Sequence, residues 1–292
     1  MLVHEQFPAR YELKYRLTKA RSERLIAAVR EILTPDEHND AASGSAVPYH
    51  VRSLYFDNAR LDGYRGKLAG LGIRAKLRLR TYGFDSPGAY LELKRKRGPL
   101  IAKSRITLPR DAPWRGSGLD LITWLRRSLC ATALPTWRRQ RPEADLEAML
   151  EWPGIRPIAV VAYERLAFGS GGPANPRITF DTSVRGVSSD RLDAIRPMRS
   201  VLSGAVVLEL KFTGRMPGFM AALIRGFQLE LESISKYGEV IEGIAPVFPV
   251  ERRHALSDEG IGWPDTSLLY AAPRTMLPLS RSGSPAIPEA HS

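Results

Sequence analysis

Charged and apolar side chains alternate along most of the predicted strands of this chain. In residues 73–80 the apolar positions Ile73, Ala75, Leu77 and Leu79 alternate with Arg74, Lys76, Arg78 and Arg80. Successive side chains on a strand point to opposite faces, so this segment has one apolar face and one ionic face. The same pattern recurs at Glu12, Lys14 and Arg16, at Glu92, Lys94 and Lys96, at Lys103 and Arg105, at Arg177 and Asp181, and at Glu209 and Lys211.

Two interpretations fit these ionic faces. Antiparallel sheets often face water on one side, which also produces alternation, and charge runs are usually solvated. A solvated face normally mixes Thr, Ser, Gln and Asn with its charges, whereas these strands carry Lys, Arg and Glu and little else. The mostly cationic character therefore favours a face that binds a polyanion together with a divalent metal.

Composition narrows the classes of protein. The 292 residues fit one large domain or two small ones, and 43% hydrophobic and 25% charged residues are ordinary for a globular protein. The net charge of +12 indicates an anionic partner, which can be nucleic acid, an anionic membrane surface or a phosphate-rich small molecule. A single cysteine, Cys130, excludes an internal disulfide and a Cys-based zinc site and favours a reducing compartment. The sequence has no apolar signal core and no run long enough to span a bilayer, so we expect a soluble or peripheral protein.

The pattern of apolar residues predicts the elements. Strands are predicted at 9–17, 49–56, 73–82, 89–96, 101–108, 158–168, 176–182 and 205–213, with a short one near 184–188. Helices are predicted at 19–33 after the N-cap Thr18, within 57–72, twice within 114–152, and from Pro217 to about 233 with Phe219, Leu223 and Phe227 as inner stripe. Residues 38–46 are predicted to form a loop.

These elements predict an α+β fold in which about eight antiparallel strands form a barrel flanked by helices. If the ionic faces point inward, the barrel is a tunnel with a charged lumen, and the apolar faces pack outward against the helices. We expect this domain to span residues 1–264 with a helical insertion at about 114–152, followed by a flexible tail at 265–292.

Most familiar catalytic motifs are absent. The segment GPLIAKS at 98–104 lacks the second glycine of a phosphate-binding loop and lies between two strands. The histidines His4, His38, His50, His254 and His291 are scattered without ligand spacing. Aromatic residues interleaved with basic ones, which RNA stacking requires, are sparse. Glu209 beside Lys211 is either a structural ion pair or a carboxylate ligand for magnesium or manganese.

Nine segments resemble the VTC domain, the polyphosphate polymerase domain of the triphosphate tunnel metalloenzyme (CYTH-like) superfamily. They are RYELKYRL at 10–17, SLYFDN at 53–58, KLRLRTYG at 76–83, YLELKRK at 90–96, AKSRITL at 102–108, YERLAF at 163–168, RITFDTSVRG at 177–186, VLELKF at 207–212 and SISKYGE at 233–239. The resemblance covers about residues 8–245 in the family's order. It implies an antiparallel tunnel that holds an ATP-derived triphosphate and a carboxylate-bound metal.

The resemblance also implies roles for individual residues. The groups that act on the transferred phosphate would be Arg78, Arg80, Lys94, Lys103, Arg165, Arg177 and Lys236. The surrounding phosphate-binding positions would be Glu12, Lys14, Lys76, Lys96, Arg105, Lys211 and Ser235. Glu209 would hold a divalent metal, Mn or Mg, and Ser235 and Lys236 would lie on the helix that closes one tunnel end.

The function implied is transfer of the terminal phosphoryl group of ATP to a growing polyphosphate chain. The alternatives are a metal-dependent triphosphatase and a polyphosphate-binding module without activity. The expected partners are ATP and inorganic polyphosphate, not nucleic acid, and the expected location is the cytoplasm, including the inner face of the membrane. The sequence lacks the phosphate-sensing and transmembrane domains of the eukaryotic pattern, which leaves open a separate membrane protein as partner.

Overall fold

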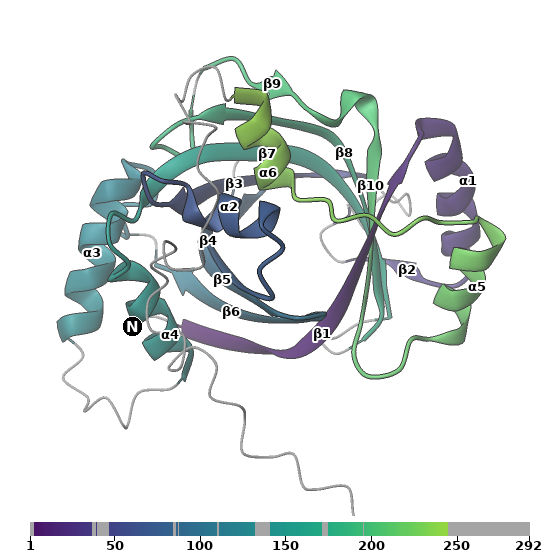
Figure 1. Cartoon of the computed structure of the whole chain (residues 1–292), viewed down its shortest axis with the longest axis horizontal. Helices are drawn as coiled ribbons and strands as arrows, with labels where there is room; N and C mark the ends of the chain where they lie inside the picture. Colours follow the sequence, from purple (N-terminus) through teal and green to yellow (C-terminus); the bar gives the residue numbers. More distant parts are fainter. Residues whose placement is uncertain are drawn as a thin grey trace, which may run out of the picture.

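The computed structural model describes residues 3–36, 39, 47–83, 86, 88–109, 111–131, 141–170, 175–194 and 196–244. Eight long antiparallel strands in this part form a closed barrel (Figure 1): β1 (Val3–Leu17), β3 (Tyr49–Asp57), β4 (Ile73–Tyr82), β5 (Ala89–Arg97), β6 (Leu100–Leu108), β7 (Arg156–Gly169), β8 (Arg177–Ser188) and β10 (Val206–Phe212). They follow one another in the order β7-β3-β4-β5-β6-β1-β10-β8, and pairing of β8 with β7 closes the ring. The two-residue strands β2 (Thr34–Pro35) and β9 (Arg199–Ser200) extend it. The predicted α+β barrel of about eight strands is confirmed.

Helices flank the barrel on two sides (Figure 1). Helices α1 (Lys19–Arg30) and α5 (Gly218–Gly226) lie on one side, and α3 (Gly118–Ala131) and α4 (Arg141–Leu150) on the other. Helices α2 (Asp62–Leu68) and α6 (Lys236–Ile244) lie at one opening of the barrel, and η3 (Leu202–Gly204) precedes β10. Thr18 caps α1 as predicted, because its hydroxyl accepts a hydrogen bond from the Arg21 N–H at 3.3 Å.

The apolar strand faces pack outward against the flanking helices, as the alternation predicts. One core joins Leu77, Leu79, Leu91 and Leu93 of the barrel to α3 and α4. A second core joins Phe180, Leu208 and Leu210 to α1 and α5. The outer faces of these strands are therefore the hydrophobic core, and their ionic faces line the lumen.

The inner wall has an apolar part that the alternation did not predict. Val161, Val184 and Val207 lie on the lumen side of β7, β8 and β10 and pack against Val240 and Ile241 of α6. Gly186 on β8 allows this contact, since an added Cβ would lie 2.4 Å from Cγ1 of Val240. Helix α6 therefore fills one side of the lumen and leaves the ionic side open.

Several element boundaries differ from prediction: β1 begins at Val3 and not at residue 9, and α1 ends at Arg30 and not at residue 33. Strand β8 is continuous from 177 to 188 and not two strands, because Ser183 with φ 52° forms a bulge that reverses which residues face inward. Helix α5 ends at Gly226 and not near 233, because Gln228 has φ 46° and the chain then runs extended to α6. Residues 265–292 and most of 38–46 lie outside the described residues.

Candidate functional site

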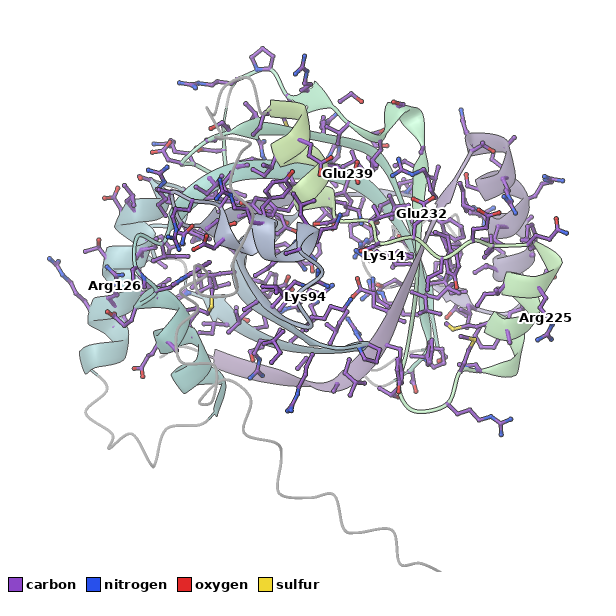
Figure 2. The ribbon with its side chains drawn as sticks, viewed as in Figure 1. Lys14, Lys94, Arg126, Arg225, Glu232 and Glu239 are labelled. Carbon is purple, nitrogen blue, oxygen red and sulfur yellow. The ribbon has the colours of Figure 1, made fainter. Side chains whose placement is uncertain are left out.

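The ionic strand faces enclose a cavity of about 510 Å³ inside the barrel. Figure 2 shows Lys14 of β1 and Lys94 of β5 pointing into this interior, whereas Arg126 and Arg225 lie on flanking helices. The carboxylates that line the cavity are Glu12, Glu209 and Glu232. Its cationic lining is far larger and consists of Arg10, Lys14, Lys67, Arg74, Lys76, Arg78, Arg80, Lys94, Lys96, Lys103, Arg165, Lys211 and Lys236. Such a surface repels itself and attracts polyanions.

Strand register sets the order of these charges. Lys76, Lys94 and Lys103 lie directly opposite one another across β4, β5 and β6. Like charges directly opposite one another destabilise a sheet, so this row of lysines lowers the stability of the ligand-free protein. One residue pair further along the same strands, Glu92 lies between Arg78 and Arg105.

Glu92 is the first of two carboxylates around which cations converge. Its side chain is 1% exposed, and its oxygens lie 2.7 Å from Arg78, 2.8 Å from Arg105, 3.5 Å from Arg80 and 3.8 Å from Lys103. Burial would raise the pKa of Glu92, but these cations hold that pKa well below its usual range. Glu92 is therefore ionised and fixes the guanidinium groups of β4 and β6 in place.

Glu209 is the second such carboxylate. Its oxygens lie 2.6 Å from Lys211, 2.8 Å from Lys236, 3.3 Å from Arg165 and 3.4 Å from Lys14. Burial opposes ionisation, yet the same cations hold the pKa of Glu209 well below its usual range. Lys236 reaches this cluster from α6, as the resemblance implies.

Two further carboxylates order the cations around Glu209. Asp181, which is fully buried, accepts two hydrogen bonds from Arg165 at 2.6 and 2.7 Å and lies 2.5 Å from Lys236. Glu12 accepts from Lys94 at 2.9 Å and lies 3.4 Å from Lys14. The cations are thus held in fixed positions by buried ion pairs before any ligand enters.

Three lysines are poorly compensated. Burial, together with neighbouring arginines, holds the pKa of Lys103 well below its usual range in spite of Glu92. Burial, together with neighbouring cations, lowers the pKa of Lys76 to about 7. Its amino group donates to the Ser235 hydroxyl at 2.8 Å and lies over the Tyr237 ring. Burial also lowers the pKa of Lys211 to about 7, in spite of the nearby Glu209 carboxylate. These three amino groups are the ones that a polyanion in the lumen would stabilise in their charged form.

Tyrosine hydroxyls complete the arginine contacts. Tyr55 accepts a hydrogen bond from Arg78 at 3.0 Å, and Tyr163 accepts one from Arg80 at 3.2 Å. Further along the lumen, the Tyr82 ring contacts the rings of Tyr49 and Tyr90 edge to face. The sequence reading found no aromatic platform, and these rings do not form a stacking surface with exposed faces; they bind guanidinium groups.

Asp57 fixes the rim of the lumen at α2 and α6. It accepts hydrogen bonds from the backbone N–H groups of Gly63 at 2.9 Å and Tyr64 at 3.1 Å. It also accepts from the Asn58 N–H at 2.9 Å and from the Tyr237 hydroxyl at 2.9 Å. One buried carboxylate thereby joins β3, the start of α2 and the start of α6.

The structure brings most of the predicted site residues together. Those that line the cavity are Glu12, Lys14, Lys76, Arg78, Arg80, Lys94, Lys96, Lys103, Arg165, Glu209, Lys211, Ser235 and Lys236. Arg105 lies just beyond it, bonded to Glu92 and over the Tyr90 ring at 4.6 Å. Arg177 lies at the barrel end, where it pairs with Asp36 and donates to the Tyr49 hydroxyl.

Sequence reasoning missed several members of the site. Arg10 and Arg74 share the alternation of Glu12 and Lys76, so the pattern already contained them. Lys67 reaches the cavity from α2, where no strand pattern could identify it. Tyr55 and Tyr163 were considered only as stacking residues and rejected as such, because only their arginine partners reveal the role of each hydroxyl.

The residues present fit a divalent metal that enters with phosphates. The described residues contain no group of three or more His, Cys, Asp and Glu side chains suited to a metal. Glu12 and Glu209 lie on neighbouring strands and approach the same Lys14 amino group, each at 3.4 Å. Magnesium is commonly held by one or two carboxylates plus substrate phosphates, which is the donor set these two residues supply.

A family model described as the VTC domain matches residues 9–244. The chain belongs to the VTC domain family. Membership and the cation-lined lumen together support a tunnel protein for triphosphate-type substrates. A comparison with curated proteins returned no match. No helix in the described part of this VTC domain is long and apolar enough to cross a membrane.

Solved structures resemble the VTC domain of this chain over most of its length. One is a Hippeastrum protein described as an adenylyl cyclase with a dominant triphosphatase activity, at 14% identity and a TM-score of 0.46, covering 84% of this chain and 100% of that one. Another is a Bacillus halodurans protein named as an adenylate cyclase, at 14% identity and a TM-score of 0.45, covering 79% and 95%. A Pyrococcus horikoshii protein has 13% identity and a TM-score of 0.40, covering 80% and 98%.

Proposed function

We propose that this chain is a metal-dependent polyphosphate polymerase that uses ATP. The observation that carries the proposal is the pair of buried carboxylates, Glu92 and Glu209, each with four cations within 4 Å. Such clusters hold cations at fixed positions while leaving a large excess of positive charge toward the cavity. A chain of linked phosphates neutralises a row of this kind better than a single anion does.

In the proposed reaction a terminal oxygen of the polyphosphate chain attacks the γ-phosphorus of ATP. The bond from this phosphorus to the bridging oxygen breaks, ADP leaves with that electron pair, and the chain is one phosphate longer. In phosphoryl transfer the protein mainly positions the reacting phosphates and neutralises their charge. No residue has to form a covalent intermediate.

The arginines suit the transferred group. Arg78 and Arg80 are held by Glu92 and by the hydroxyls of Tyr55 and Tyr163, which fixes the direction of each guanidinium. Planar guanidinium groups bind phosphate oxygens through two parallel hydrogen bonds. Arg78 and Arg80 are two residues apart on one face of β4, so their Cα atoms are about 7 Å apart. From there their long side chains can bind phosphates of the same chain.

The remaining cations would bind the flanking phosphates. Lys14, Lys211 and Lys236 surround Glu209, and Lys94 and Lys103 lie opposite each other on β5 and β6. Glu209, with Glu12 beside it, would hold the divalent metal. A metal held there, Mn or Mg, would supply positive charge that neutralises phosphate oxygens. Arg105 and Arg177 would act on phosphates nearer the far end.

A direct assay tests the proposal. The purified protein is incubated with ATP and manganese, and orthophosphate, ADP and long-chain polyphosphate are resolved. Polymerase activity releases one ADP for each phosphate that is added to long-chain polyphosphate. Orthophosphate without long chains would contradict it, and so would binding of polyphosphate with no turnover of ATP.

A triphosphatase is the second candidate, and the tyrosine layer favours it. Beyond Arg80, Tyr82 contacts both Tyr49 and Tyr90, and Arg105 lies against Tyr90, so side chains occupy the lumen at this end. A lumen that is open at one end only suits hydrolysis, whereas a growing polyphosphate chain has to leave through a second opening. The same assay decides between the two by the ratio of orthophosphate to long chains.

ATP and polyphosphate are therefore the proposed partners, and the cytoplasm, where ATP is present, is the proposed location. A separate membrane protein that receives the product stays a prediction from the resemblance.

A further inference from the structure

A second cavity, of about 140 Å³, lies on the outer face of the barrel wall over β3, β4, β7 and β8. Arg52, Thr81 and Ala162 line it, and each is one residue from Ser53, Arg80 and Tyr163, which face the lumen. Because strand side chains alternate, the two cavities lie back to back on the same strands. The outer cavity is thus separate from the lumen.

Strand register gathers cations in the outer cavity. Arg52 pairs with Ala162, and Ala162 pairs with Arg185, so two arginines flank one small residue. Arg115 completes the cationic side of the lining, and the His50 imidazole lies beside these arginines. The small Ala162 side chain leaves room between the arginines that a longer side chain would fill.

These cations have few anionic partners. Asp193 is the one carboxylate among the described lining residues, and it is bonded to Arg191 at 3.0 Å. Glu164 approaches His50 at 3.8 Å from the next position on β7. The Nε atom of Arg52 is buried without a hydrogen-bond partner, although its Nη2 atom donates to the Ala194 carbonyl at 2.7 Å. A buried N–H of a charged group without a partner is costly, which indicates that something else satisfies it.

The cover over these cations is apolar. Trp114, Leu192 and Met198 line the same cavity, and the Arg115 guanidinium lies 4.1 Å from the Trp114 ring centroid. Burial lowers the pKa of Arg52, and burial together with Arg185 lowers the pKa of His50. Both shifts have the direction expected for cations that are desolvated beside other cations, a state that an anion would relieve.

We propose that the outer cavity is a binding site for one phosphate group, either free or at the end of a phosphate chain. Guanidinium forks are suited to tetrahedral oxyanions because each offers two parallel N–H donors. The cavity volume of about 140 Å³ is several times the roughly 30 Å³ that a water occupies, so the cavity has room for one tetrahedral anion. The site does not depend on the reaction proposed for the lumen.

Fluorescence of Trp114 reports on this site. The full chain is titrated with inorganic phosphate against chloride at constant ionic strength, and Trp114→Phe identifies the part of the signal that comes from Trp114. We expect saturation with phosphate and not with chloride. We expect Arg185→Ala to weaken phosphate binding at least tenfold and Arg115→Ala to weaken it as well. The matched control is Arg225→Ala on α5, which is exposed on the opposite side of the barrel and is expected to bind as wild type does (Figure 2).

The double variant Arg78→Ala/Arg80→Ala separates this site from the lumen. The Trp114 signal persists in it if the outer cavity binds phosphate. Loss of the signal there, or wild-type binding by both Arg185→Ala and Arg115→Ala with native circular dichroism, would overturn the proposal. In the same double variant, competition by tripolyphosphate identifies a chain end as the ligand, and no competition identifies free phosphate.

Discussion

Lys76→Met should remove one pH-dependent component of stability from the ligand-free protein. Burial lowers the pKa of Lys76 from 10.5 to about 7. Below about pH 7 the folded protein therefore holds a charged amino group in a place that disfavours it. Between about pH 7 and 10.5 the unfolded chain binds a proton there that the folded protein does not, so stability rises with pH in this window.

The magnitude follows from the shift. One pKa unit corresponds to 1.36 kcal/mol, so the full shift corresponds to about 5 kcal/mol as an order of magnitude. Between pH 8 and 9 this lysine alone should raise the free energy of unfolding by about 1.3 kcal/mol per pH unit. Lys211, whose pKa is also lowered to about 7, contributes a similar slope that remains in the variant.

Urea unfolding at pH 7.5, 8.25 and 9.0, without phosphates, measures these slopes. Lys76→Met should be more stable than wild type at pH 7.5, and its slope should be smaller by about 1.3 kcal/mol per pH unit. Lys19→Met, at an exposed position on α1, controls for the loss of one lysine outside the lumen. Equal slopes in Lys76→Met and wild type would refute the argument that Lys76 is desolvated without compensation.

Three further predictions concern the lumen. Bound tripolyphosphate should raise the pKa of Lys76, so tripolyphosphate should bind less tightly as pH rises and this lysine loses its proton. From pH 7 to 9 the affinity for tripolyphosphate, measured by calorimetry, should fall more steeply in wild type than in Lys76→Met, with a difference of up to about tenfold per pH unit. Parallel pH profiles of the two proteins would refute this. Arg80→Lys should lower phosphoryl transfer at least tenfold with the fold intact, because an ammonium cannot replace the fork that bonds Tyr163 and Ser53, and near-normal turnover would remove Arg80 from the site. Glu209→Gln should raise the half-saturating manganese concentration at saturating ATP, and an unchanged value would exclude Glu209 as the metal ligand.

The strands and the lumen were predictable because one pattern encoded both. The alternation at 73–82 predicts the bounds of β4. Because a strand has only two faces, it also predicts which side chains pack outward in the core and which cations face the lumen. Arg74 already lay on this ionic face, and the alternation of β1 extended by one step from Glu12 would have added Arg10 to the site.

The remaining features depend on contacts that are distant in sequence. The apolar side of the lumen exists because Gly186 lets Val240 approach, and these residues are far apart along the chain. The bulge at Ser183 and the end of α5 before Gln228 depend on residues with positive φ that are not glycine. Such positions carry no reliable signal in a sequence, because tertiary packing and not local preference selects their conformation.

Asp57 has a consequence for which substrates the lumen can admit. Its carboxylate holds the start of α2 and the Tyr237 hydroxyl of α6 at the same time, so the two helices at the opening are joined as a rigid collar (Figure 1). The collar cannot widen without leaving a buried carboxylate short of a donor, which is costly. We therefore expect Asp57 and its donors to limit the width of a ligand that enters the lumen, and the lysines and arginines inside to select for its charge. A variant that loosens the collar should accept bulkier polyanions while keeping its preference for phosphate.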